Sequence, residues 1–254
     1  MPDGVLMRTD RVWAIARADG SVRSGLLPRQ PLARVPVVRV LTGLGPALLL
    51  GLRGGDRSGQ RSRPWPLIRG IVLAQLVVLG ANWVASRLHL GRHWSPLLEI
   101  AILVSAIAAF RVATPARQWR MHGAEHKAVA AHERGIDLDD VPAVLGCSRV
   151  HPRCGTNVVV WAVVAVVLLG RLPWLPQLAG SIVAIAVGAE IMSLAARHGD
   201  AWPAKLLQAP GGLLQWSLTT SEPTAADQII GCRALTACLE RHAAWAETLD
   251  YAAN

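Results

Sequence analysis

The residues best suited to metal binding or catalysis form the pentapeptide His122-Gly-Ala-Glu125-His126. At 100° per residue on an α-helix, His126 lies about 40° from His122, and Glu125 lies about 60° to the other side of His122. Two imidazoles at this spacing can bind one divalent ion, and the carboxylate beside them can bind the ion or act as a general base. The pattern therefore predicts metal-dependent chemistry, with a solvated polar helix face as the alternative interpretation.

A second group of potential metal ligands lies downstream, where Cys147, His151 and Cys154 fall within eight residues. Thiolates and imidazoles bind zinc, and ligand spacings of about two to four residues are typical of zinc sites. Three ligands do not by themselves define a structural zinc site, and inert thiols in a reducing cytoplasm are the alternative. Cys232 and Cys238 have no such neighbours, so we predict that they are packing residues.

A third candidate is Glu190, the only charged residue between Arg171 and Arg197. A carboxylate within an apolar helix is costly, so it is expected to face the interior of a helix bundle and to have a function. At 1.5 Å per residue, Glu190 lies about 10 Å from the Arg197 end of such a helix. It can therefore meet the histidine motif if that end lies on the same side of a membrane. An ion pair with Arg197 is the alternative.

Apolar stretches of membrane-spanning length surround these residues. Hydrophobic residues make up 52% of the chain and charged residues 17%, whereas soluble domains carry about 25% charge. A transmembrane helix needs about 20 apolar residues, and four windows between arginines, at 69–87, 92–111, 153–171 and 171–197, approach that length. We therefore expect a mainly α, polytopic helical membrane protein with about four transmembrane helices. Residues 37–52 are too short to span and are predicted to form a re-entrant or interfacial segment.

The arginines predict the topology of these helices. Of the 26 basic residues, 23 lie in segments 1–69, 111–153 and 197–254. The positive-inside rule then places both termini in the cytoplasm, in a multi-pass protein of the inner (cytoplasmic) membrane of a bacterium. Because the basic residues are spread over loops without a recognition motif, we predict no nucleic-acid partner and expect membrane lipids instead. Ten Trp against one Tyr and one Phe fit this environment, since Trp is favoured at membrane–water interfaces.

The polar segments predict smaller elements. The alternation of polar and apolar residues over 11–17, followed by the turn at Asp19-Gly20, predicts a small N-terminal β-hairpin. Residues 116–134 predict a helix that ends at Gly135, and a final helix is expected from Thr224. Residues 205–215 are amphipathic and are expected to be interrupted at Pro210-Gly-Gly. In chain order, we predict a cytoplasmic strand-rich segment (1–36), a re-entrant or interfacial helix (37–52), a first transmembrane hairpin (66–112), a cytoplasmic helical insert with both motifs (113–155), a second transmembrane hairpin (156–196) and cytoplasmic C-terminal helices (197–254).

Several strings occur together and in one order: Asp3-Gly-Val-Leu-Met-Arg8, His122-Gly-Ala-Glu-His-Lys127, His151-Pro-Arg-Cys-Gly-Thr156, Ala189-Glu190-Ile191, and Pro210-Gly-Gly-Leu-Leu-Gln215 followed by Thr219-Thr-Ser-Glu-Pro223. Over nearly its whole length, the chain resembles the DUF1385 family of bacterial membrane proteins, which are described as predicted metal-dependent enzymes. The resemblance implies one site formed by His122, Glu125, His126, His151, Cys154 and Glu190. Ile229 or Ile230 stands where the family carries an acidic residue, so the resemblance assigns no carboxylate from the last helix.

The leading hypothesis is a membrane-embedded metal-dependent enzyme, a zinc hydrolase acting at the cytoplasmic membrane face on a membrane-proximal substrate. Its proposed metal ligands are His122 and His126, completed by His151, Cys154 or Glu190. Glu125 would be the general base, and Lys127 would stabilise developing negative charge. Two alternatives remain: a non-catalytic membrane protein with a structural metal site, and a small transporter that uses Glu190 as an ion relay.

Overall fold

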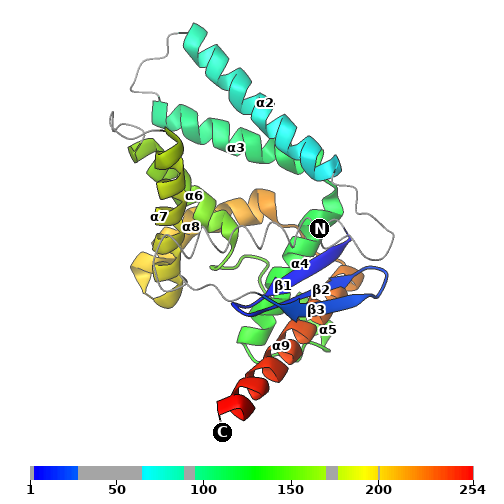
Figure 1. The fold of residues 1–254 in the computed structure, drawn as a ribbon. Helices are drawn as coiled ribbons and strands as arrows, with labels where there is room; N and C mark the ends of the chain where they lie inside the picture. The colour runs from blue at the N-terminus through cyan, green and yellow to red at the C-terminus, as the bar shows by residue number, and fades with distance from the viewer. Residues whose placement is uncertain (1–2, 28–64, 89–94, 170–176, 200, 254) are drawn as a thin grey trace. The chain divides into compact units, whose positions relative to one another are not determined.

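The computed structural model describes residues 3–27, 65–88, 95–169, 177–199 and 201–253. These residues are mainly helical and carry a small antiparallel sheet at the N-terminus, as predicted (Figure 1). The chain divides into two compact units, which are described separately below. The first unit contains residues 1–62, 117–154 and 220–254, and the second contains residues 63–116 and 155–219. The segment predicted to be re-entrant, 37–52, lies outside the described residues.

The sheet of the first unit is a three-stranded meander of β1 (Gly4–Arg8), β2 (Val12–Arg17) and β3 (Val22–Leu26). The predicted hairpin corresponds to β2 and β3, which are antiparallel and are connected through Gly20 at a φ of 83°. A positive φ is readily adopted by glycine, which explains the turn. Strand β1 pairs with β2 along its whole length and was not predicted as a separate strand.

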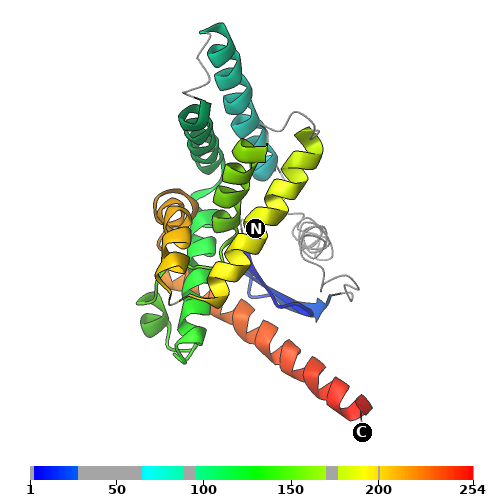
Figure 2. The same ribbon diagram turned by 90° about the vertical axis from the view of Figure 1, so that its left-hand side faces the viewer.

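Helices α4 (Ala116–Glu133) and α9 (Ala225–Ala253) share a core with this sheet. Figures 1 and 2 show α9 running beside the strands, which contact it along their length. The core is built from small and medium apolar side chains: Val5, Met7, Val12, Ala14 and Ala16 of the sheet, Met121, Ala128 and Ala131 of α4, and Ile230, Ala234, Leu235 and Cys238 of α9. Cys232 is buried in the same cluster, so the prediction that Cys232 and Cys238 are packing residues is confirmed.

Helix α4 ends as its sequence predicts. The amide of Gly135 donates to the carbonyl of His132, and the amide of Ile136 donates to that of Ala131, while Gly135 has a φ of 70°. This pair of hydrogen bonds is a Schellman motif, which needs a left-handed residue at the helix end. The chain then turns into the short helix α5 (Val141–Leu145), whose amide at Ala143 is capped by the Asp140 carboxylate.

The second unit contains a helix at each of the four predicted apolar windows: α2 (Trp65–Arg87), α3 (Ser95–Ala113), α6 (Gly155–Leu169) and α7 (Gln177–Arg197). Helices α2 and α3 pack together, as do α6 and α7, where a Cβ at Gly188 would lie 2.6 Å from the backbone nitrogen of Ala162. Among the described residues, one helix is long and apolar enough to cross a membrane, over Ile68–Arg87. The number rises to two if Ile100–Ala113 and Ala116–Glu133 form one broken span. The four-span arrangement therefore stays a prediction.

The predicted interruption at Pro210 is wrong. Helix α8 (Trp202–Leu214) continues through Pro210 and leads directly into a π-helix, η1 (Gln215–Thr219). Proline lacks the amide that would donate to the Leu206 carbonyl one turn earlier, so the helix continues with one backbone hydrogen bond fewer. Gly211 is required by packing, because a Cβ there would lie 1.7 Å from Oδ1 of Asn157 on α6.

The start of α9 is fixed by a reciprocal cap that also binds α4. The Asp227 amide donates to Oγ1 of Thr224, the Thr224 amide faces the Asp227 carboxylate, and Nε of Arg120 donates to Asp227 over 2.8 Å. Arg117 approaches the same carboxylate to 3.4 Å. Burial opposes the charge of Asp227, but the hydrogen bonds from Arg120 and Thr224 outweigh it and lower the pKa. The Asp227 carboxylate thus binds arginines of α4, and the expectation that the last helix supplies no carboxylate to the metal site stays a prediction.

Asp227→Asn is expected to lower the free energy of unfolding of the first unit by about 1–3 kcal/mol at neutral pH, the usual range for hydrogen bonds to charged groups. The folded-state pKa lies below the unfolded value, so the stabilisation is present above about pH 4 and is lost as pH falls through the folded-state pKa. Denaturant unfolding across this pH range should show the deficit of Asp227→Asn shrinking at low pH. Glu247→Gln, an exposed change on the same helix, is the control. A deficit independent of pH would contradict this assignment.

Candidate metal centre

Helix α4 brings the two histidines of the motif into contact. The ring centroids of His122 and His126 lie 4.4 Å apart, with the ring planes inclined at 63°. His126 is buried and His122 is half-buried. The predicted placement of two imidazoles one turn apart on one helix face is thus confirmed.

Cys154 joins these histidines from the end of the loop that follows α5. Its Sγ lies 3.6 Å from Nε2 of His122, and one ligand atom from each of His122, His126 and Cys154 lies within 4.8 Å of the other two. In a tetrahedral zinc site with bonds of about 2.3 Å to sulfur and 2.05 Å to nitrogen, the sulfur–nitrogen distance is about 3.6 Å. The Cys154–His122 pair already has this separation, and the remaining atoms need to approach by about 1.5 Å at most.

The tautomer of His126 suits a metal ligand. Its Nδ1 lies 2.7 Å from the carbonyl oxygen of Arg149, which can only accept a hydrogen bond. The proton is therefore assigned to Nδ1, which leaves the lone pair on Nε2. A backbone carbonyl that holds the other ring nitrogen is the usual partner of a metal-bound histidine, because it fixes both the tautomer and the ring orientation.

The Arg149 carbonyl is held in place by the side chain of its own residue. Nε of Arg149 donates to Glu222 over 2.9 Å, and one terminal nitrogen donates to Oγ1 of Thr220 over 2.9 Å. These contacts attach the loop to the segment that precedes α9. Arg149 and Glu222 were not predicted as site residues, although Glu222 lies in a string that carries the family resemblance.

Lys127 forms hydrogen bonds with the same loop. Its ammonium donates to the carbonyls of Leu145 and Cys147 over 2.6 and 2.8 Å, and it forms an ion pair with Glu222 over 3.0 Å. The three protons of the ammonium therefore have three acceptors. Through these contacts Lys127 positions the loop, and its predicted role in stabilising developing negative charge stays a prediction.

His151 lies beside the cluster but directs its nitrogens elsewhere. Its ring centroid is 5.9 Å from that of His126, and its Nδ1 accepts the backbone N–H of Arg153 over 3.2 Å. The ring proton is therefore on Nε2, which lies 3.2 Å from the Glu133 carboxylate. Both nitrogens have partners other than the cluster, and a ligand role for His151 stays a prediction.

The two predicted carboxylates, Glu125 and Glu190, belong to different units of the chain. Glu125 directly precedes His126 on α4 and is half-buried, and burial raises the pKa of its carboxyl, against the opposing charge of His122. Glu190 is half-buried in α7 and belongs to the second unit. Its membership of the same centre stays a prediction.

Gly123, between the histidine and the glutamate, is small for a structural reason. A Cβ on Gly123 would lie 2.1 Å from the carbonyl oxygen of Ser221. One residue later, Ala124 meets α9, where a Cβ on Gly231 would lie 2.9 Å from its carbonyl oxygen and Gln228 donates to that oxygen over 3.1 Å. The backbone of α4 is thus covered closely on this side.

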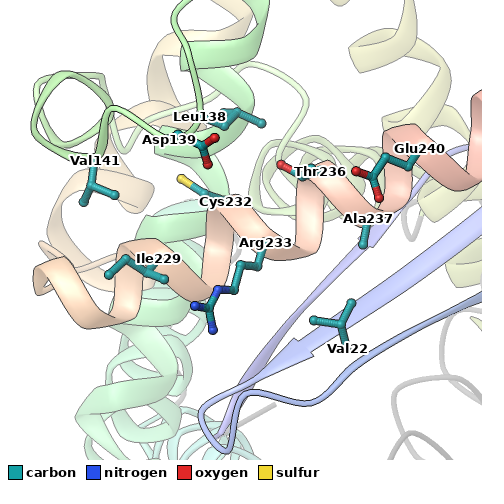
Figure 3. A pocket seen from close by; sticks show the side chains of 10 residues that line it. All are labelled: Val22, Leu138, Asp139, Val141, Ile229, Cys232, Arg233, Thr236, Ala237 and Glu240. Carbon is teal, nitrogen blue, oxygen red and sulfur yellow. The ribbon is translucent and has the colours of Figure 1, made fainter.

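A cavity of about 520 Å³ lies elsewhere in the first unit, between β3, α9 and residues 138–141 (Figure 3). It contains none of the predicted site residues. The Cys232 thiol points toward Asp139 in this view, and burial, reinforced by the Asp139 charge, raises the pKa of that thiol. A protonated thiol is a poor nucleophile, so the raised pKa disfavours reaction at Cys232.

The family model for DUF1385, described as a protein of unknown function, matches residues 89–241, more than half of the chain. The chain belongs to the DUF1385 family. No curated protein and no solved structure is significantly similar to it. The DUF1385 match includes both the α4 histidine motif and the loop that ends at Cys154, so the three clustered residues all lie within the family region.

Gly123→Ala tests the close approach of the Ser221 carbonyl. The added methyl group cannot be accommodated without moving backbone, so we expect a loss of about 1–3 kcal/mol, larger than the helix-propensity gain of about 1 kcal/mol. Gly80→Ala is the matched control, because a Cβ at Gly80 in α2 meets no atom within 4 Å. Thermal unfolding of both variants measures the difference. Wild-type stability of Gly123→Ala would show that the two segments do not pack as described.

Proposed function

We propose that this DUF1385 protein is a membrane-embedded metal-dependent enzyme, a zinc hydrolase that acts at the cytoplasmic membrane face. The observation that carries the proposal is the His122–His126–Cys154 group, whose ligand atoms lie within 4.8 Å of one another. It is the one group of this kind within the described parts of the chain. The orientation of His126 by the Arg149 carbonyl supports the same conclusion.

The donor set favours zinc and an incomplete coordination sphere. Two imidazoles and one thiolate suit zinc better than the harder divalent ions, which prefer oxygen ligands. Three protein ligands leave a position open, as in catalytic zinc sites, whereas structural sites have four. His151 is held by Glu133 and Arg153, which argues against it as the fourth ligand. A zinc ion held there would polarise a substrate bond and lower the pKa of water.

The protein's own contribution would be to orient the ligands and to accept a proton. Glu125 occupies the position before His126, on the same helix, and burial raises the pKa of its carboxyl. We assign it the role of general base. Lys127 and Arg149 would hold the loop that carries Cys154, through the contacts with Glu222.

The membrane part of the proposal rests on α2 and on charge. Several apolar side chains of α2 are exposed, among them Leu76, Leu79 and Trp83, and a bilayer would cover them. The basic residues of segments 1–69, 111–153 and 197–254 support cytoplasmic termini and a multi-pass arrangement. The substrate would then be a membrane-proximal peptide bond or a lipid-linked group.

Metal analysis of the purified chain tests the centre directly. We expect about one zinc per chain, and a loss of affinity of more than about 100-fold in His126→Ala or Cys154→Ala, since loss of an outer partner alone costs about 10–100-fold. With Co²⁺ in place of zinc, Cys154→Ala should also lose the thiolate charge-transfer absorption. His132→Ala, an exposed change on α4, should alter neither signal. Substoichiometric metal that is unchanged in His126→Ala would overturn the proposal.

Glu125→Gln separates catalysis from structural metal binding. As a general base contributes about 10²–10⁴-fold to rate, we expect zinc binding to be retained while complementation of a strain lacking the gene is lost. Glu240→Gln, an exposed change on α9, should complement fully. Loss of zinc binding in Glu125→Gln would make Glu125 a ligand, and full complementation with zinc bound would favour a structural metal site.

A further inference from the structure

Helix α8 and the π-helix η1 expose one continuous apolar stripe. Trp202, Leu206, Leu213 and Trp216 are 76%, 65%, 65% and 62% exposed. At 100° per residue, Trp202, Leu206 and Leu213 fall within an arc of about 40° on α8, and exposed Ala209 lies about 20° beyond that arc. Trp216 follows them in the π-helix. Large apolar side chains of an amphipathic helix normally face a protein core, whereas these face outward.

The opposite face of α8 is the one that packs within the second unit. Gly211 lies against Asn157, the Trp161 indole on α6 donates to the Leu207 carbonyl over 2.8 Å, and Gln208 donates to the Ala195 carbonyl of α7 over 3.2 Å. These contacts fix the rotation of α8 about its axis. The stripe therefore faces outward because polar and small residues hold the other side.

The charge and composition of the segment favour a bilayer as its occupant. Residues 201–219 contain one charged residue, Lys205, and no acidic residue. Tryptophan at both ends suits the membrane–water interface, and a lone cation suits an anionic leaflet. Helices α6 and α7, on which α8 packs, also leave apolar side chains such as Val164, Ile185 and Leu194 exposed. A lipid surface would cover all three helices, whereas a protein partner at the stripe would leave α6 and α7 uncovered.

We propose that α8 and η1 form an in-plane helix at the cytoplasmic membrane surface, with the Trp202–Trp216 stripe inserted at the boundary between headgroups and acyl chains. Such helices lie about 5–10 Å into this boundary. Only residues 198–201 separate α7 from α8, so α8 begins where α7 reaches the surface if α7 spans the bilayer. This inference rests on the membrane placement in the proposed function and adds a lipid-binding surface to it.

A fluorophore attached at Leu206→Cys or Leu213→Cys tests this surface in the full chain, reconstituted in vesicles of zwitterionic and anionic phospholipid. The four native cysteines are buried, and the unsubstituted chain provides the labelling background. Leu76→Cys on α2 is the deep-membrane control, and Asp19→Cys in the exposed β-turn is the aqueous control. Quenching is compared between lipids with a nitroxide near the headgroup and lipids with a nitroxide near the chain end.

The α8 labels should emit at blue-shifted wavelengths and be quenched roughly twofold more by the shallow nitroxide than by the deep one, as expected for a depth of about 5–10 Å. The Leu76 label should show the reverse preference. If the α8 labels emit as in water while the Leu76 label is quenched by the deep nitroxide, the surface-helix proposal is overturned and the membrane part of the proposed function stands. A water-like Leu76 label would instead refute the membrane part of the proposed function. Blue-shifted α8 labels that neither lipid quenches would assign the stripe to a protein partner and overturn the proposal.

Discussion

The first unit depends on the close approach of other backbone to α4 at Gly123 and Ala124. The Ser221 carbonyl occupies the space of a side chain at Gly123, and α9 meets Ala124 through Gly231. This contact determines where the segment before α9 crosses α4. Glu222 belongs to that segment, so the anchors of the Cys154 loop depend on a contact that admits no side chain at Gly123.

Two carboxylates near the start of α9 form ion pairs with four basic side chains from the middle of the chain. Asp227 binds Arg117 and Arg120, and Glu222 binds Lys127 and Arg149. One set lies on the first turns of α4, and the other joins α4 to the loop. Ion pairs thus join segments that lie 73 to 110 residues apart in the sequence, beside the apolar core that α4 and α9 share.

The sequence predicts what is local. The spacing of His122, Glu125 and His126 and the helix end at Gly135 depend only on helical periodicity and on glycine conformation, and the structure has both. The partners of Lys127 and the continuation of α8 through Pro210 could not be predicted, because each depends on a distant segment: the Leu145 and Cys147 carbonyls for Lys127, and Asn157 for α8. Intrinsic propensity is overridden where such packing is tight.

The close contact between Gly211 and Asn157 has a geometric consequence. A Cβ at position 211 would lie 1.7 Å from Oδ1 of Asn157, so α8 cannot turn about its own axis without separating from α6. Any larger residue at this position would therefore change the rotation of α8, and with it the direction in which the exposed side chains of that helix face.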